Sequence, residues 1–206
     1  MSVSIDELLL AYARLGLRHW ASESPRVKAR ARTIGVDIPT QQAVAERAVT
    51  SPFRPSAQSG NPMRLIPMPC KQNRVFAAFF APWLGGTNPA GLSFDLVVLL
   101  QQGSPYAFRF EPGSQYSTTA HGYDHVQLNK SLGVRHVSLD GASSQLPTTY
   151  PAFPIRSNTP VSRFLAMAVA MHGYPSGVDD VLDRAFKGQP NKRKTYLNIT
   201  KAMFTR

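Results

Sequence analysis

Residues 92–111 read LSFDLVVLLQQGSPYAFRFE and contain two apolar, β-branched and aromatic runs separated by residues typical of turns. The runs extend over 92–103 and 106–113, and links this short favour hairpins over crossover connections. Comparable runs recur along the chain and predict an antiparallel meander of about five strands. The other three predicted strands cover residues 74–84, 123–129 and 134–140.

Helical patterns lie before and after these strands. Ser4 followed by Glu7 predicts a capping box at the start of a helix through residue 20. Thr159 and Gly173 are placed as the N-cap and the terminator of a buried apolar helix. The sequence therefore predicts an α+β fold: an antiparallel sheet of about five strands with N- and C-terminal helices packed on one face. Two further helices are predicted, at 40–49 and at 176–186 with Ser176 as N-cap.

Proline density and charge divide the chain into four predicted parts. Five prolines between residues 51 and 72 forbid a regular interior helix and indicate a linker or a segment laid over the surface. The 206 residues are long enough for one domain with a core, or for a domain with an appendage. The predicted parts are a basic helical N-terminal segment (1–50), the Pro-rich linker (51–72), an α+β core domain (73–188) and a basic C-terminal tail (189–206).

The formal net charge of +11 is concentrated at the two ends of the chain. Residues 1–74 hold 11 Lys and Arg against 5 Asp and Glu, and residues 184–206 hold 7 against none. The cations in residues 26–32 alternate with small or apolar residues, which would align them along one side of an extended segment. Such ends would bind a polyanion through phosphate neutralisation. The predicted nucleic-acid contacts are Arg26, Lys28, Arg30, Arg32, Lys192, Arg193 and Lys194.

Alternation in two neighbouring strands predicts a cluster of titratable side chains. Arg109 and Glu111 share the polar face of one strand, and Tyr123 and His125 share the polar face of the next. If the strands pair as a hairpin with their apolar sets toward the core, these four side chains project together. Their groups match those needed for metal-independent RNA cleavage, in which an acid–base pair moves protons and a cation stabilises the phosphorane-like transition state. Imidazole suits either proton-transfer role.

The same cluster has a structural alternative. A sheet covered by helices on one face displays polar residues on the other, and a one-residue slip in register would scatter the set. Asp124 falls on the apolar side, so it lies at the strand edge or is buried with a partner such as His172 or a backbone amide. His172 itself is predicted to cap the end of the 159–173 helix and interact with its dipole.

Several other classes of site are not supported by the sequence. Cys70 is the only cysteine, which excludes an internal disulfide and a cysteine-based zinc site. On a strand, His121 and His125 would lie about 13 Å apart and could not share one ion. No metal and no cofactor is therefore expected. The sequence has no long apolar run and no leader pattern at its start, so no membrane partner is expected and the default location is the cytoplasm.

The leading hypothesis is a nucleic-acid-binding protein, with RNA or DNA as partner, that acts as a metal-independent ribonuclease of toxin or defence type. The alternative is a non-enzymatic basic module or accessory subunit that engages nucleic acid or a larger protein partner in a multiprotein complex. A third class is a small-molecule or nucleotide sensor that uses the same site.

Overall fold

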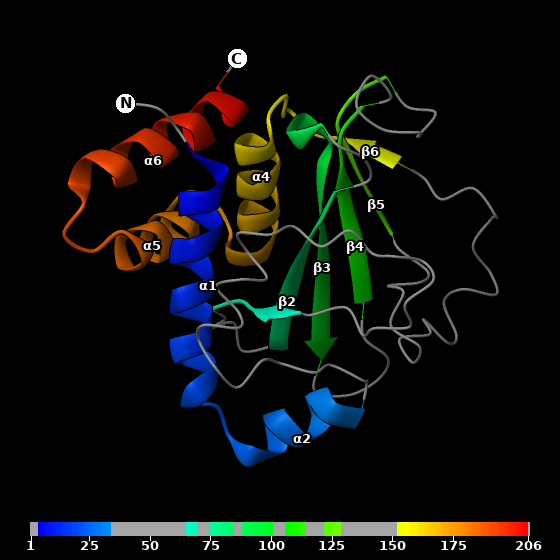
Figure 1. Ribbon diagram of the computed structural model, residues 1–206, viewed down its shortest axis with the longest axis vertical. Helices are drawn as coiled ribbons and strands as arrows, with labels where there is room; N and C mark the ends of the chain where they lie inside the picture. Colours follow the sequence, from blue (N-terminus) through cyan, green and yellow to red (C-terminus); the bar gives the residue numbers. More distant parts are fainter. Residues whose placement is uncertain are drawn as a thin grey trace.

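The two apolar runs at 92–111 form the central hairpin of a six-stranded antiparallel sheet (Figure 1). The strand order follows the chain from β1 to β6, so the sheet is a meander. Its strands are β1 (Ile66–Pro67), β2 (Val75–Leu84), β3 (Leu92–Leu100), β4 (Tyr106–Glu111), β5 (His125–Leu128) and β6 (Ala152–Pro154). The computed structural model describes residues 4–33, 65–69, 75–84, 88–100, 106–113, 122–128 and 152–205.

The α+β prediction is confirmed, with differences at the edges of the sheet. Strands β1 and β6 were not predicted, and β1 lies within the 51–72 segment that we expected to be a linker. The predicted strand at 134–140 and the predicted helix at 40–49 lie outside the described residues. Within the described part, the meander of short links was correctly inferred from the turn residues.

Four helices pack on one face of the sheet: α1 (Ile5–Ala21), α4 (Pro160–His172), α5 (Ser176–Ala185) and α6 (Pro190–Phe204). Figure 1 shows α1 and α4 side by side against the sheet, with α5 and α6 outside them. A short 3-10 helix, η1 (Pro89–Gly91), precedes β3.

Of the three N-cap residues predicted from the sequence, Ser4 and Thr159 occupy that position in the structure and Ser176 does not. The Ser4 hydroxyl accepts from the backbone N–H of Glu7, and Thr159 forms a capping box with Ser162. Gly173 ends α4 with a φ of 82°, which glycine adopts at little steric cost. The Ser176 prediction was wrong: Ser176 is the first residue of α5, and Pro175 occupies the N-cap position without a side-chain hydrogen bond.

Two basic segments are helical where we expected otherwise. The 26–32 cations lie on helix α2 (Pro25–Thr33), not on an extended strand. Val27 and Ala31, four residues apart, form its buried stripe. The segment expected as a tail at 189–206 contains α6, whose Tyr196, Thr200 and Met203 are buried at helical spacing.

The main core lies between the sheet and the four helices. Tyr12 of α1 and Phe80 and Phe94 of the sheet surround Phe164 of α4 in edge-to-face contacts with ring centroids 5.1–5.4 Å from Phe164. Such arrangements match the quadrupoles of the rings as well as burying area. A second, smaller core on the opposite face contains Val27, Ala31, Leu65, Ala77, Phe79, Ala81, Val97, Leu99 and Ala107.

Candidate functional site

The register between β4 and β5 brings three of the four predicted catalytic residues together. Glu111 pairs with His125, and Arg109 pairs with Gln127. The predicted residues Arg109, Glu111 and His125 therefore share one face of the sheet with Gln127. This is the hairpin register on which the sequence prediction depended. We call Asp95, Arg109, Glu111, His125 and Gln127 the polar cluster.

Glu111 and His125 form the central contact of the polar cluster. The Nε2 atom of His125 lies 3.3 Å from Oε2 of Glu111, and the amide of Gln127 donates to the same oxygen at 2.8 Å. The Nδ1 atom of His125 lies 3.0 Å from the backbone carbonyl of Tyr123. Because a carbonyl only accepts, Nδ1 is the donor in the contact with Tyr123, and the Nε2 atom faces the Glu111 carboxyl.

Arg109 is held by a carboxylate that the sequence prediction missed. Its Nε and Nη2 atoms donate to the two carboxylate oxygens of Asp95 at 2.7 and 3.1 Å, a bidentate pair. Its Nη1 lies 3.7 Å from Oε1 of Glu111. Asp95 sits directly opposite Arg109 in the β3–β4 register. The signal was available: Asp95 is the one charged residue in the apolar run of β3.

Burial and charge shift the pKa values of this cluster. Burial raises the pKa of the Glu111 carboxyl, and the charges of Arg109 and His125 oppose that rise only in part. For Arg109, burial alone would lower the pKa, but the hydrogen bond and charge of Asp95 outweigh it and raise the pKa above its usual value. Arg109 therefore remains a cation, whereas the Glu111 carboxyl holds its proton to a higher pH than an exposed glutamate does.

Access to solvent distinguishes Tyr123 from its predicted partners. Tyr123 precedes β5, is 46% exposed, and lies edge-on to the His125 ring with centroids 6.1 Å apart. His125 is 0% exposed and Glu111 is 4% exposed. In this arrangement the imidazole and the carboxyl are both out of reach of a phosphodiester in solvent. In this geometry the polar cluster ties β3, β4 and β5 together.

Asp124 forms a second buried polar group. The Arg163 guanidinium donates to Oδ2 of Asp124 through Nε at 3.1 Å, and its Nη2 lies 3.0 Å from the same oxygen in an ion pair. The Ser157 hydroxyl donates to Oδ2 at 2.6 Å and the backbone N–H of Gly113 to Oδ1 at 3.0 Å. Asp124 thus has the predicted backbone amide as a partner, but its ionic partner is Arg163 and not His172. Arg163 also donates to the carbonyls of Ala90 and Leu92.

His172 is the last residue of α4, but its imidazole is uncharged there at neutral pH. Its ring lies against Tyr12 of α1, with centroids 5.9 Å apart. Burial and the nearby positive charge of Arg184 lower its pKa to about 4. At neutral pH the ring is uncharged, so the predicted interaction of an imidazolium with the helix dipole is absent.

The predicted nucleic-acid contacts on α6 are mostly engaged within the protein. Lys192 donates to Glu7 of α1 at 2.8 Å, and Arg193 contacts Asp179 at 2.6 Å and Asp183 at 3.1 Å on α5. Lys194 is exposed. Helix α2 differs in charge density: Pro25–Thr33 holds four cations and no acidic residue within nine residues, whereas the four cations of α6 are spread over fifteen. Of the α2 cations, Arg26 and Arg32 are exposed and Lys28 donates to the carbonyl of Ala21.

The described residues contain neither a candidate metal site nor a membrane-spanning helix. No group of three or more His, Cys, Asp and Glu side chains there could hold a metal ion. None of the helices described is both long and apolar enough to cross a membrane. Comparison of the chain with protein-family models, curated proteins and solved structures found no match.

Proposed function

We propose that this protein binds nucleic acid through helix α2, as a basic module that does not cleave its ligand. The observation that supports the proposal is the charge of α2: four cations and no acid within nine residues. Cations that replace the counterions of phosphates supply affinity without reading sequence. The ligand class is therefore RNA or DNA with little sequence preference.

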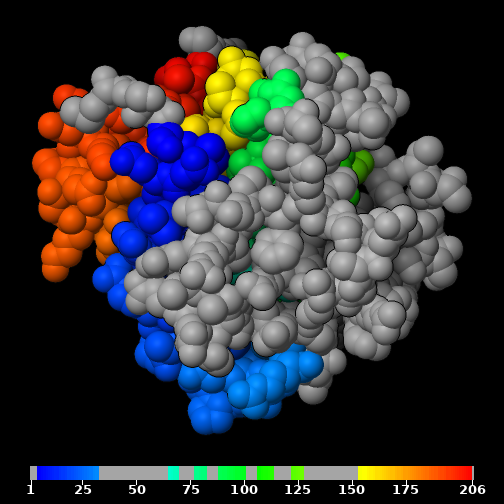
Figure 2. Space-filling model, in the orientation of Figure 1, coloured from blue at the N-terminus to red at the C-terminus, as the bar shows by residue number. Residues whose placement is uncertain are grey.

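The position of α2 supports a single contact surface. Val27 and Ala31 anchor the helix on the second core with Phe79 of β2, which leaves Arg26 and Arg32 exposed and Lys28 and Arg30 half-buried. Figure 2 shows α2 along the lower edge of the molecule, at the end opposite α6. The basic helices near the two ends of the chain therefore form separate surfaces. Two cations of α6, Lys192 and Arg193, form ion pairs with acidic residues of α1 and α5.

The test is the salt dependence of binding to a fluorescein-labelled 20-nucleotide RNA and to the matching DNA, measured by anisotropy. The variant replaces Arg26, Lys28, Arg30 and Arg32 with Gln. Each phosphate contact contributes about 0.7 to 0.9 to the slope of log K against log salt. We expect the variant to lose a slope of about 2 to 3 and at least tenfold in affinity near 100 mM salt.

A matched control neutralises three exposed cations at the other end of the molecule, Lys187, Lys194 and Lys201. This variant lowers net charge by a similar amount, so it should change the slope by less than about 1 if binding is local to α2. Equal losses in the two variants would mean that binding follows net charge alone. Full affinity in the α2 variant would remove α2 as the contact surface. Circular dichroism checks that both variants fold.

The ribonuclease hypothesis makes the opposite prediction about turnover. Because His125 and Glu111 are buried, we expect wild-type protein to bind the labelled RNA without producing fragments over hours in EDTA. Fragments that disappear in His125→Gln protein, while anisotropy still reports binding, would support the enzyme and overturn the non-enzymatic proposal.

A further inference from the structure

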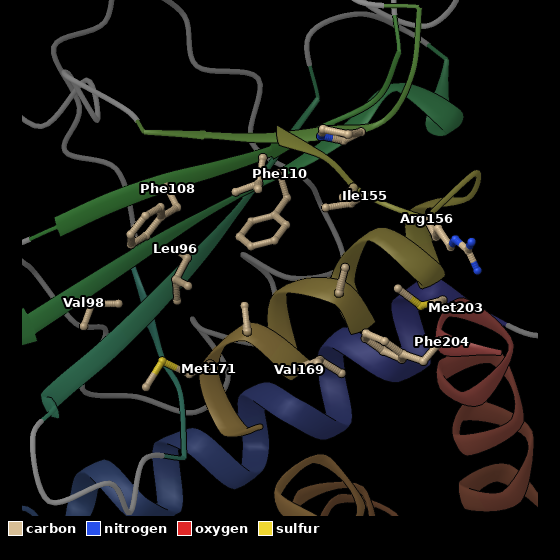
Figure 3. Close-up of a pocket in the computed structure, with 14 residues that line it drawn as sticks. Leu96, Val98, Phe108, Phe110, Ile155, Arg156, Val169, Met171, Met203 and Phe204 are labelled. Carbon is tan, nitrogen blue, oxygen red and sulfur yellow. The ribbon is translucent and has the colours of Figure 1, made fainter. Parts of the chain in front are cut away.

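A groove lies on the helix-covered face of the sheet, away from the polar cluster and from α2. Its volume is about 780 Å³. Strands β3 to β5 form its floor, α4 forms one wall, and the end of α6 closes it (Figure 3). The lining residues are Leu96, Val98, Phe108, Phe110, Val126, Pro154, Ile155, Arg156, Ala166, Val169, Ala170, Met171, Met203 and Phe204.

The groove exists because α4 covers β3 and only part of β4. On the outward side of α4, Ala166 and Ala170 are too small to fill the space above the sheet. Phe108 and Val126 on the sheet are left half-buried, and Phe204 at the end of α6 is 49% exposed. Apolar surface of this kind, concave and partly open, is typical of a ligand site.

The lining of the groove is almost entirely apolar. Thirteen of its fourteen residues are apolar, and Arg156 is the one charged residue among them. Arg156 follows β6 at the end of the groove beside Ile155 and Met203; it is exposed, and its guanidinium points away from the apolar floor (Figure 3). Its Nη1 donates to the carbonyl of Thr205 at 3.1 Å, which ties the guanidinium to the end of α6. The site is an apolar trough with a cation at one end.

We propose that this groove binds one long-chain amphiphile with an anionic head group, a fatty-acid carboxylate. The acyl chain lies on Phe108, Phe110 and Val126, and the exposed Arg156 side chain turns from the Thr205 carbonyl to pair with the carboxylate. The volume lies within the roughly 300–1,000 Å³ of small-molecule sites, whereas a protein partner would need about 800 Å² of contact on this side. An uncharged apolar partner would not use the guanidinium at the rim.

Titration calorimetry with dodecanoate, below its critical micelle concentration, tests the proposal. We expect one dodecanoate per chain and a several-fold weaker affinity for dodecanol, which has the same chain and no charge. Arg156→Gln should weaken dodecanoate binding about fivefold, as for an exposed ion pair, and leave dodecanol binding unchanged. Lys201→Gln removes an exposed cation outside the lining and controls for the general charge of the surface.

A steric variant tests the location of the chain. Ala166→Phe places a ring in the groove and should reduce the affinity for both ligands at least tenfold. Ala29→Phe adds the same ring at an exposed alanine of α2 and should change neither affinity. Equal affinities for dodecanoate and dodecanol, or an unaffected Ala166→Phe protein, would overturn the proposal. So would a concentration-dependent dimer in analytical ultracentrifugation that Ala166→Phe abolishes, because the occupant would then be a second copy.

Discussion

At the scale of single residues, the chain buries two charged groups on opposite sides of its sheet. The polar cluster holds β3, β4 and β5 together on one side. On the other side Arg163 of α4, at 0% exposure, reaches Asp124 and the carbonyls that precede and begin β3. Arg163 joins α4 to Leu92 at the start of β3 and to Asp124 just before β5, so the loss of this group would affect the packing of α4.

Asp124→Asn should therefore destabilise the protein strongly. The substitution keeps the shape of the side chain but leaves the buried Arg163 guanidinium without its counter-charge, and breaking a buried pair in this way costs about 3–5 kcal/mol. Urea unfolding followed by circular dichroism measures the change in the free energy of unfolding.

The exposed pair between Arg184 and Asp180 is the matched control for that experiment. Its atoms are 2.8 Å apart in an i,i+4 arrangement on α5, and Asp180→Asn should cost less than about 0.5 kcal/mol. If Asp124→Asn costs no more than the control, the buried pair does not stabilise the fold.

The sequence predicted which face of the sheet these side chains occupy better than it predicted how deeply they are buried. Strand alternation correctly placed Arg109, Glu111 and His125 on one face, because the side-chain period of a strand is two. The burial of a side chain depends on which elements cover that face of the sheet, and the alternation of polar and apolar residues does not report on this cover. Asp95 is the one charged residue of β3 but was missed, because its role depends on the cross-strand partner Arg109, fourteen residues away.

At the scale of elements, capping and apolar spacing predicted α1 and α4 well, and net charge misled the reading of α2 and α6. The alternating cations of α2 resemble a strand pattern, but Val27 and Ala31 at i,i+4 decide the element. In α6 the basic residues suggested a tail, while Tyr196, Thr200 and Met203 supply a narrow buried stripe. Strand β1 has only two residues, so its sequence shows no strand-like alternation from which it could have been predicted.

The contact between α1 and β1 gives a prediction at this scale. A Cβ atom at Gly16 would overlap the backbone carbonyl of Pro67, so α1 approaches the edge of the sheet closely only because residue 16 is glycine. In a free helix Gly→Ala gains about 1 kcal/mol, but overpacking against backbone costs about 1–3 kcal/mol or more. We expect Gly16→Ala to lower the free energy of unfolding by at least about 1 kcal/mol.

Gly122→Ala serves as the comparison. Gly122 is exposed, and an added Cβ there meets no atom within 4 Å. This substitution should change stability by less than about 0.5 kcal/mol in the same thermal or urea melts. A stabilised Gly16→Ala protein would show that α1 can move away from β1 at little cost.

At the scale of the whole molecule, the ends of the chain belong to the main core. The Tyr196 hydroxyl of α6 donates to the carbonyl of Ser4 at 2.9 Å, 192 residues away, and its ring stacks on Phe186. Lys192 and Glu7 connect the same two helices at the surface. Charge and proline content suggested separate basic ends, but the apolar residues of α1 and α6 lie in one cluster with those of the sheet.

Tyr196→Ala tests whether this connection makes the fold one cooperative unit. Removing a buried aromatic ring costs about 3–5 kcal/mol, and we expect that loss in a single transition. The midpoints from circular dichroism, which reports mainly on helices, and from tryptophan fluorescence, which includes Trp20 beside Phe79 on the second core, should fall together. Tyr196→Phe removes only the hydrogen bond to Ser4 and should cost about 1 kcal/mol. If the helical signal of Tyr196→Ala protein is lost well before the fluorescence change, the terminal helices unfold separately, as the four-part division of the sequence would require.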